Sequence, residues 1–148
     1  MRINGGWFES DEHVPQPVVI GVLQTADGRW VQCPFLIDTG ASTTVLTPKV
    51  LRQLDRPVTL APKQLMGVGG PVETWQVWTT LAFLRTDDQP TIIEGAYSAF
   101  QVESALEMSV LGYDVLKLFA LIVDRPGDTV CLLVPPLRYV IPTDSSTP

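Results

Sequence analysis

Apolar and polar residues alternate over much of the chain, which predicts a mainly β protein. Residues 17–38 (PVVIGVLQTADGRWVQCPFLID) are interpreted as two strands joined by a turn at Asp27-Gly28, because this dipeptide favours β-hairpins. A second long strand is expected within residues 63–88, after a glycine cluster. One face of that strand carries large apolar side chains and, near its start, one acidic residue: Trp75, Val77, Leu81, Phe83 and Glu73.

Further segments complete the predicted order of elements. Residues 47–55 (TPKVLRQLD) are expected as a turn or a single helical turn, and residues 91–104 as one bent strand or a strand pair. A last strand is expected at residues 128–134 (DTVCLLV), ended by two prolines. Between them, the spacing i, i+3, i+4, i+7 predicts a helix with an apolar stripe: Val115, Leu118, Phe119 and Ile122.

Length and composition fit a single globular domain. The chain has 148 residues, of which 45% are hydrophobic and 18% charged, enough apolar residues for a core. The domain is expected to be all-β with one short C-terminal helix, and to span residues 18–134. Residues 1–17 are expected as a lead-in and residues 135–148 as a loose tail. The lead-in could be a regulatory propeptide, a strand of a dimer interface or a loose segment, and the sequence does not distinguish these.

Charge and single residue types exclude several classes of function. A net charge of −6 and an isoelectric point near 4.6 argue against nucleic acids and anionic membranes as partners. The sequence contains neither a secretion-type apolar stretch nor a run long enough to span a membrane, so a cytoplasmic protein is expected. Cys33 and Cys131 lack metal-ligand spacing and are expected as buried thiols, a disulfide being the less favoured alternative. No metal or cofactor is expected. His13, the single histidine, lies in a Pro-flanked segment, which disfavours a histidine-dependent mechanism.

Residues 35–43 (FLIDTGAST) contain the strongest candidate chemistry. Three apolar residues lead directly into Asp38, although an unpaired ionised carboxylate is costly in a core. Taken alone, Asp-Thr-Gly is a common turn after a strand, and for the triplet by itself this interpretation is favoured. The apolar flanks and the small residues 40–44 favour a functional site over a plain turn, because small residues allow a backbone to approach a partner chain or a ligand.

Together with two other segments, this loop resembles the retropepsin-like aspartic proteases. FLIDTGASTTVL resembles their active-site loop, and VLGYDVLKLFALIVD, from Val110, resembles their apolar strand, glycine and short helix. The resemblance covers residues 18–134 and is closer to cellular and bacterial members than to viral ones. Tyr113 stands where viral members usually carry arginine, so the arginine–carboxylate brace of the viral loop cannot form. MGVGG resembles the flap tip, although alone it could be a plain hairpin turn: Met66, Gly67, Val68, Gly69 and Gly70.

This resemblance implies a closed β-barrel assembled as a symmetric homodimer. The chain carries one Asp-Thr-Gly, so a complete site would need Asp38 from each of two chains on a two-fold axis. The two carboxyl groups would share a proton and the attacking water. Thr39 would brace the two loops, and Gly40 would let them approach each other. Asp38 is therefore expected to be close to buried, against a second Asp38.

The same resemblance assigns supporting roles. Gly112 would pack against the back of the active-site loop, whereas Asp114 is interpreted first as an acidic residue that interacts with a helix dipole. Ala41 lacks a hydroxyl that some members direct at the catalytic carboxylate, so a less acidic pH optimum is expected, with Ser42 as the candidate for that hydroxyl role. The glycine-rich flap would close over the substrate and exclude water. The segment DTVCLLV is the candidate dimer-interface strand.

The sequence therefore predicts a homodimeric aspartic endopeptidase that acts on a peptide or protein substrate. The alternative is a catalytically inactive protease-like fold that binds peptides or mediates dimerisation, because fold and function are separable.

Overall fold

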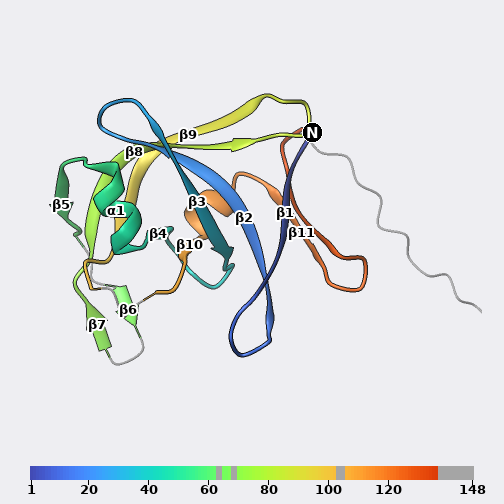
Figure 1. Cartoon of the computed structure of the whole chain (residues 1–148), viewed down its shortest axis with the longest axis horizontal. Coiled ribbons are helices and arrows are strands. Elements are labelled where there is room, and N and C mark those ends of the chain that lie inside the picture. The colour runs from blue at the N-terminus through green and yellow to red at the C-terminus, as the bar shows by residue number, and fades with distance from the viewer. Residues whose placement is uncertain (63–64, 68–69, 103–105, 137–148) are drawn as a thin grey trace, which may run out of the picture.

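The computed structural model describes residues 1–62, 65–67, 70–102 and 106–136, and within them the chain is mainly β (Figure 1). The two helices are short: α1 (Pro48–Leu54) and α2 (Tyr113–Leu116). Neither is long and apolar enough to cross a membrane. The strands are β1 (Arg2–Glu9), β2 (Pro15–Gln24), β3 (Trp30–Ile37), β4 (Val45–Leu46), β5 (Val58–Leu60), β6 (Leu65–Gly67), β7 (Gly70–Val72), β8 (Trp75–Leu84), β9 (Pro90–Ala99), β10 (Ser109–Leu111), β11 (Ala120–Asp124) and β12 (Thr129–Leu133).

Ten strands form one sheet that closes on itself. Their order is β11-β12-β1-β2-β3-β10-β4-β9-β8-β5, and an additional pairing of β2 with β8 joins the two ends of its central part. The six strands β2, β3, β10, β4, β9 and β8 thereby form a closed barrel, which confirms the predicted barrel fold. Strands β6 and β7 pair only with each other and form a separate hairpin.

The core fills the inside of this barrel. Phe35 of β3 and Phe83 of β8 are fully buried, with ring centroids 6.3 Å apart. The predicted alternation of β8 is present, because Val77, Leu81 and Phe83 are all buried. Burial of large apolar side chains is the main favourable contribution to folding, so these positions fix which face of each strand points inward.

The expected hairpin is confirmed, and two element predictions are refined. Strands β2 and β3 pair antiparallel up to Gln24 and Trp30, on either side of the Asp27-Gly28 turn. The segment 91–104 contributes one strand, β9. The segment 47–55 contains seven helical residues rather than one turn. Thr47 caps α1 by accepting a hydrogen bond from the Val50 amide, which satisfies one of the free donors at the helix start.

The predicted apolar stripe on a C-terminal helix is wrong. Helix α2 ends at Leu116, and the chain continues as β11. Leu118 and Ile122 are 44% and 38% exposed, so they do not share a buried face with Val115. Ile122 instead pairs with Cys131 in the β11–β12 hairpin. Strand pairing over five residues satisfies the backbone groups of β11, which a short isolated helix cannot match in stability.

The amino-terminal segment is part of the sheet. β1 pairs with β12 through residues 2–4 and with β2 through residues 5–9, so the sheet extends beyond the start predicted at residue 18. β1 and β11 lie at the same end of the molecule (Figure 1). β12, the candidate interface strand, has β11 on one side and β1 on the other, and the outer edge here belongs to β11. Cys33 and Cys131 are buried free thiols, as expected. Most of the predicted tail lies outside the described residues.

Candidate active site

The loop between β3 and β4 presents Asp38 at the surface. Its backbone amide donates to the Leu111 carbonyl of β10 at 3.2 Å, and the Ala41 amide donates to the Asp38 carbonyl at 3.2 Å. The Gly40 amide donates to Asp38 Oδ1 at 2.9 Å. Asp38, Thr39 and Gly40 are all exposed in the single chain, and the burial of Asp38 against a second Asp38 stays a prediction. The strand leads the chain out of the core instead of burying the carboxylate.

A partly buried polar cluster fastens this loop to the start of α2. Thr44 is fully buried, and its hydroxyl donates to Asp114 Oδ1 at 2.7 Å. The Thr44 amide donates to the same carboxylate at 2.9 and 3.0 Å. In turn, the Gly112 amide donates to the Thr44 hydroxyl at 3.1 Å. These bonds hold the loop against the segment that joins β10 to α2.

Backbone bonds extend the same connection. The Tyr113 amide donates to the Ala41 carbonyl at 2.8 Å, and the Asp114 amide donates to the Ser42 carbonyl at 3.2 Å. The Asp114 carboxylate also accepts from the Val115 amide at 2.9 Å, in the first turn of α2. Asp114 is therefore more than the helix-dipole residue first expected, because it joins two segments. Thr44 was not among the predicted site residues. Its position between the loop and β4 was the one feature of the sequence that pointed to a supporting role.

Gly112 lies against the backbone of the loop. A Cβ atom at this position would lie 2.3 Å from the Thr43 carbonyl carbon and 2.4 Å from the Thr43 oxygen. The φ angle of Gly112 is −95°, so glycine is needed for space and not for an unusual backbone angle.

Replacing Thr44 by valine is expected to lower the free energy of unfolding by about 2–3 kcal/mol, because the Gly112 amide loses its acceptor and Asp114 loses a donor. Thr44→Ser is the matched control, since it keeps the hydroxyl, and is expected to cost about 1 kcal/mol. Urea unfolding at one protein concentration measures both. Equal stability of the valine variant and the wild type would contradict a structural role for the hydroxyl.

A tyrosine lies near the polar cluster. Burial of Tyr97 raises the pKa of its hydroxyl well above the ordinary value, and the negative charge of Asp114 adds to this rise. The hydroxyl donates to the Ile93 carbonyl at 2.9 Å. Tyr97 therefore stays neutral and serves as a hydrogen-bond donor within β9. Among the described residues, no group of three His, Cys, Asp or Glu side chains could hold a metal ion. His13 pairs with Glu9 at 3.2 Å.

The second predicted segment forms the β6–β7 hairpin, which lies apart from the barrel in Figure 1. Gly67 pairs with Gly70, and Gly70 has a φ of +119°, a conformation that favours glycine. Val68 and Gly69 lie outside the described residues, and Met66 belongs to β6. At the base, the Thr74 hydroxyl accepts from the Leu65 amide at 3.4 Å and donates to the Val72 carbonyl at 3.1 Å.

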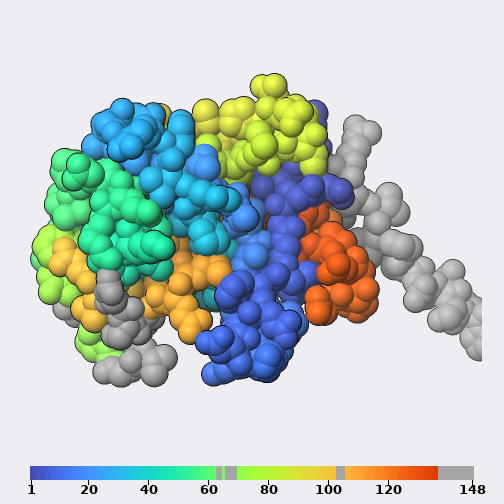
Figure 2. Space-filling model, viewed as in Figure 1, coloured from blue at the N-terminus to red at the C-terminus, as the bar shows by residue number. Residues whose placement is uncertain are grey.

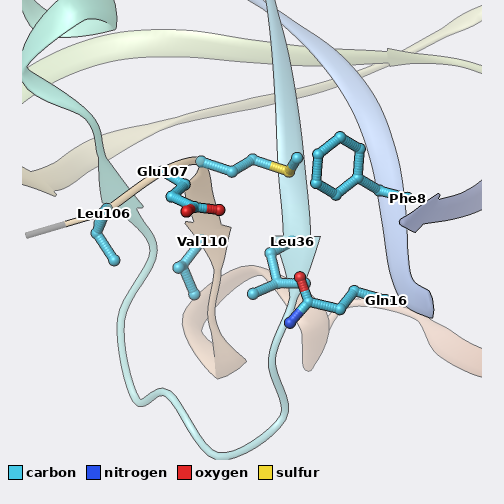
Figure 3. A pocket seen from close by; sticks show the side chains of 7 residues that line it. Phe8, Gln16, Leu36, Leu106, Glu107 and Val110 are labelled. Atoms are coloured by element: carbon cyan, nitrogen blue, oxygen red, sulfur yellow. The ribbon is translucent and has the colours of Figure 1, made fainter. Parts of the chain in front are cut away.

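A small pocket lies beside β3, the strand that leads into the Asp38 loop. Its cavity volume is about 240 Å³. Leu36 of β3 precedes Asp38 by two residues, and Val110 of β10 adjoins the Leu111 carbonyl that binds the Asp38 amide. Figure 3 shows these side chains facing the same space as residues from β1 and β2. The full lining is Phe8, Gln16, Leu36, Leu106, Glu107, Met108 and Val110. No contiguous motif predicts this pocket; in the sequence only the alternation of Leu36 with core residues points to it.

Comparisons with known proteins identify a family and a similar fold. A sequence model of the aspartyl protease family matches residues 24–115. The fold is similar to EIAV protease, solved with the inhibitor HBY-793, at 25% identity and a TM-score of 0.51, covering 69% of this chain and 86% of that one. It is also similar to a retropepsin-like aspartic protease from Rickettsia conorii, at 15% identity and a TM-score of 0.55, covering 89% and 88%. No curated protein sequence matches significantly.

Proposed function

Because this chain belongs to the retropepsin-like aspartyl protease family, we propose that it is an aspartic endopeptidase that works as a homodimer. One observation carries the proposal. The Asp38 carboxylate stands exposed at the end of an apolar strand, on a loop that partly buried hydrogen bonds fasten to α2. A fastened loop holds its carboxylate in one position, and fixed positions are what catalytic groups require.

Two chains are proposed because the reaction needs two carboxyl groups. Hydrolysis requires a base for the attacking water and an acid for the carbonyl oxygen at nearly the same place. Each chain has one Asp-Thr-Gly. The exposure of Asp38, Thr39 and Gly40 in the single chain supports this proposal, since a second loop on a two-fold axis would cover them.

The proposed reaction conserves atoms and protons. The ionised Asp38 of one chain takes a proton from water, and the water oxygen bonds to the peptide carbonyl carbon. The partner's Asp38, which starts protonated, gives its proton to the carbonyl oxygen, so a tetrahedral diol forms. A proton then passes to the amide nitrogen, the carbon–nitrogen bond breaks, and an acid and an amine leave.

Other described parts have matching proposed roles. The β6–β7 hairpin would close over the bound peptide and exclude water, as lids do in other enzymes. The pocket beside Leu36 would hold one side chain of that peptide. Thr44, Gly112 and Asp114 would act as positioning residues, because they hold the loop without reaching the reacting atoms.

A chain-mixing experiment tests the shared site. Wild type is assayed on a mixed peptide library with substrate in large excess, alone and with a tenfold excess of Asp38→Asn chain. Activity per wild-type chain is expected to fall about tenfold, because nearly every wild-type chain then pairs with a chain lacking the carboxylate. An inert protein added at the same excess is the control.

Two outcomes would contradict the proposal. Unchanged activity under conditions where mass measurements show mixed dimers would mean that each chain cuts alone. Peptide binding without any cleavage by wild type, at concentrations where the dimer forms, would instead support the alternative of a binding module.

A further inference from the structure

The pocket beside the Asp38 loop combines apolar walls with a carboxylate, and we propose that it selects a lysine or arginine side chain of the peptide substrate. This inference rests on the proposed function, because it assigns the substrate class of the same site. Phe8, Leu36, Met108 and Val110 supply apolar surface, and Glu107 supplies the negative charge. In Figure 3 the Glu107 carboxylate faces the space between Leu36 and Val110.

The size of the pocket suits a single long side chain. Its volume of about 240 Å³ lies below that of small-molecule sites, which typically occupy about 300–1,000 Å³. The walls come from β1, β2, β3, β10 and the residues that precede β10, so the space is an opening between elements. Lysine and arginine place methylene groups along apolar surface while the charged end reaches polar groups, and this arrangement matches the lining.

The charge of the lining specifies a cation. Glu107 is exposed, and no described residue forms a hydrogen bond or ion pair with it. Gln16, on the neighbouring strand, offers an amide oxygen as a second acceptor. The lining contains no basic residue. An apolar side chain would cover the Glu107 carboxylate without offering it a donor, which costs binding energy.

The neighbouring turn between β1 and β2 carries the same sign. Beyond Phe8, Glu9 at the end of β1 is exposed, as are Asp11 and Glu12 in the turn before β2. The His13 ring lies 3.2 Å from Glu9. Figure 2 shows this turn (blue) protruding beside the residues around β10 (orange). The chain as a whole has a net charge of −6. Such a field raises the local concentration of basic peptides and lowers that of acidic ones.

The test uses one peptide series that differs at a single position relative to the cleaved bond: lysine, arginine, norleucine or glutamate. Norleucine matches the lysine stem without its charge. For wild type, kcat/KM for lysine is expected to exceed that for norleucine about 3- to 5-fold, the upper part of the range for an exposed ion pair. Glu107→Gln is expected to bring this ratio close to one, and Glu107→Lys to favour glutamate. Glu94→Gln, an exposed change on β9, is the matched control and should keep the wild-type ratio.

Binding separates this inference from the proposed function. Anisotropy of labelled peptides on Asp38→Asn protein reports the lysine-to-norleucine affinity ratio even if wild type cleaves nothing. A ratio above about 3 that Glu107→Gln removes would support the pocket assignment in either case. Equal affinities for lysine and norleucine, or a ratio unchanged in Glu107→Gln, would overturn it while leaving the peptidase proposal intact.

Discussion

Asp38→Asn is expected to lower kcat/KM for peptide hydrolysis by at least about 1,000-fold. In a homodimer this change removes both carboxyl groups together, so the attacking water loses its base and the carbonyl oxygen loses its acid. Folding should be little affected, because the side chain at position 38 is exposed. In the wild type the Gly40 amide donates to Asp38 Oδ1 at 2.9 Å, and the asparagine Oδ1 can accept the same hydrogen bond. Initial rates on the most rapidly cleaved library peptide measure the loss.

Asp55→Asn is the matched control for this result. Asp55 is exposed at the end of α1 with a φ of 50°, a conformation that asparagine tolerates well. Its activity and inhibition by a pepstatin-type compound should equal those of wild type. Equal activity of Asp38→Asn and wild type, with both variants folded and dimeric, would exclude an aspartic mechanism.

Gly112→Ala is expected to destabilise the fold by about 3 kcal/mol or more, and to reduce activity in the fraction that remains folded. The new methyl group would lie 2.3 Å from a backbone carbon of Thr43 and 2.8 Å from the Thr44 amide nitrogen. Backbone atoms cannot turn aside as a flexible side chain can. Thr44 is also fixed by Asp114, so relief requires moving the loop that carries Asp38.

Gly95→Ala provides the comparison, because a Cβ there would meet only Tyr97 ring atoms at 3.9 Å. It should leave the free energy of unfolding, measured with urea, within about 0.5 kcal/mol of wild type. If Gly112→Ala matched Gly95→Ala in stability, the close contact between Gly112 and the loop would not be a constraint on the fold.

Local pattern was sufficient for the strands that line the barrel. The alternation in β8 and the turn at Asp27-Gly28 each depend on residues that are adjacent in the sequence, so the sequence alone predicts them. The Asp-Thr-Gly loop was recognisable for a similar reason, because its apolar flanks and small residues are contiguous. Its exposure was not predictable in the same way, since a carboxylate after an apolar strand fits both a buried and an emerging chain.

Features that depend on residues far apart in the chain could not be predicted from the sequence. The apolar spacing after Gly112 fits a helix. The second half of that segment instead forms β11, because its backbone pairs with β12. Thr44 reads as one of several small loop residues, and its role appears only once Asp114 lies beside it. The pocket likewise combines side chains from both ends of the chain, such as Phe8 and Met108, which no local pattern brings together.

The bond between Thr44 and Asp114 joins positions 70 residues apart, which has a consequence for synthesis. A ribosome releases the Asp38 loop long before it releases β10 and α2. Until then the loop has neither the Leu111 carbonyl nor the Asp114 carboxylate to hold it. Contacts this distant in sequence form late in folding. We therefore expect the nascent chain to be unable to cut peptides until β10 and α2 have emerged and folded against the loop.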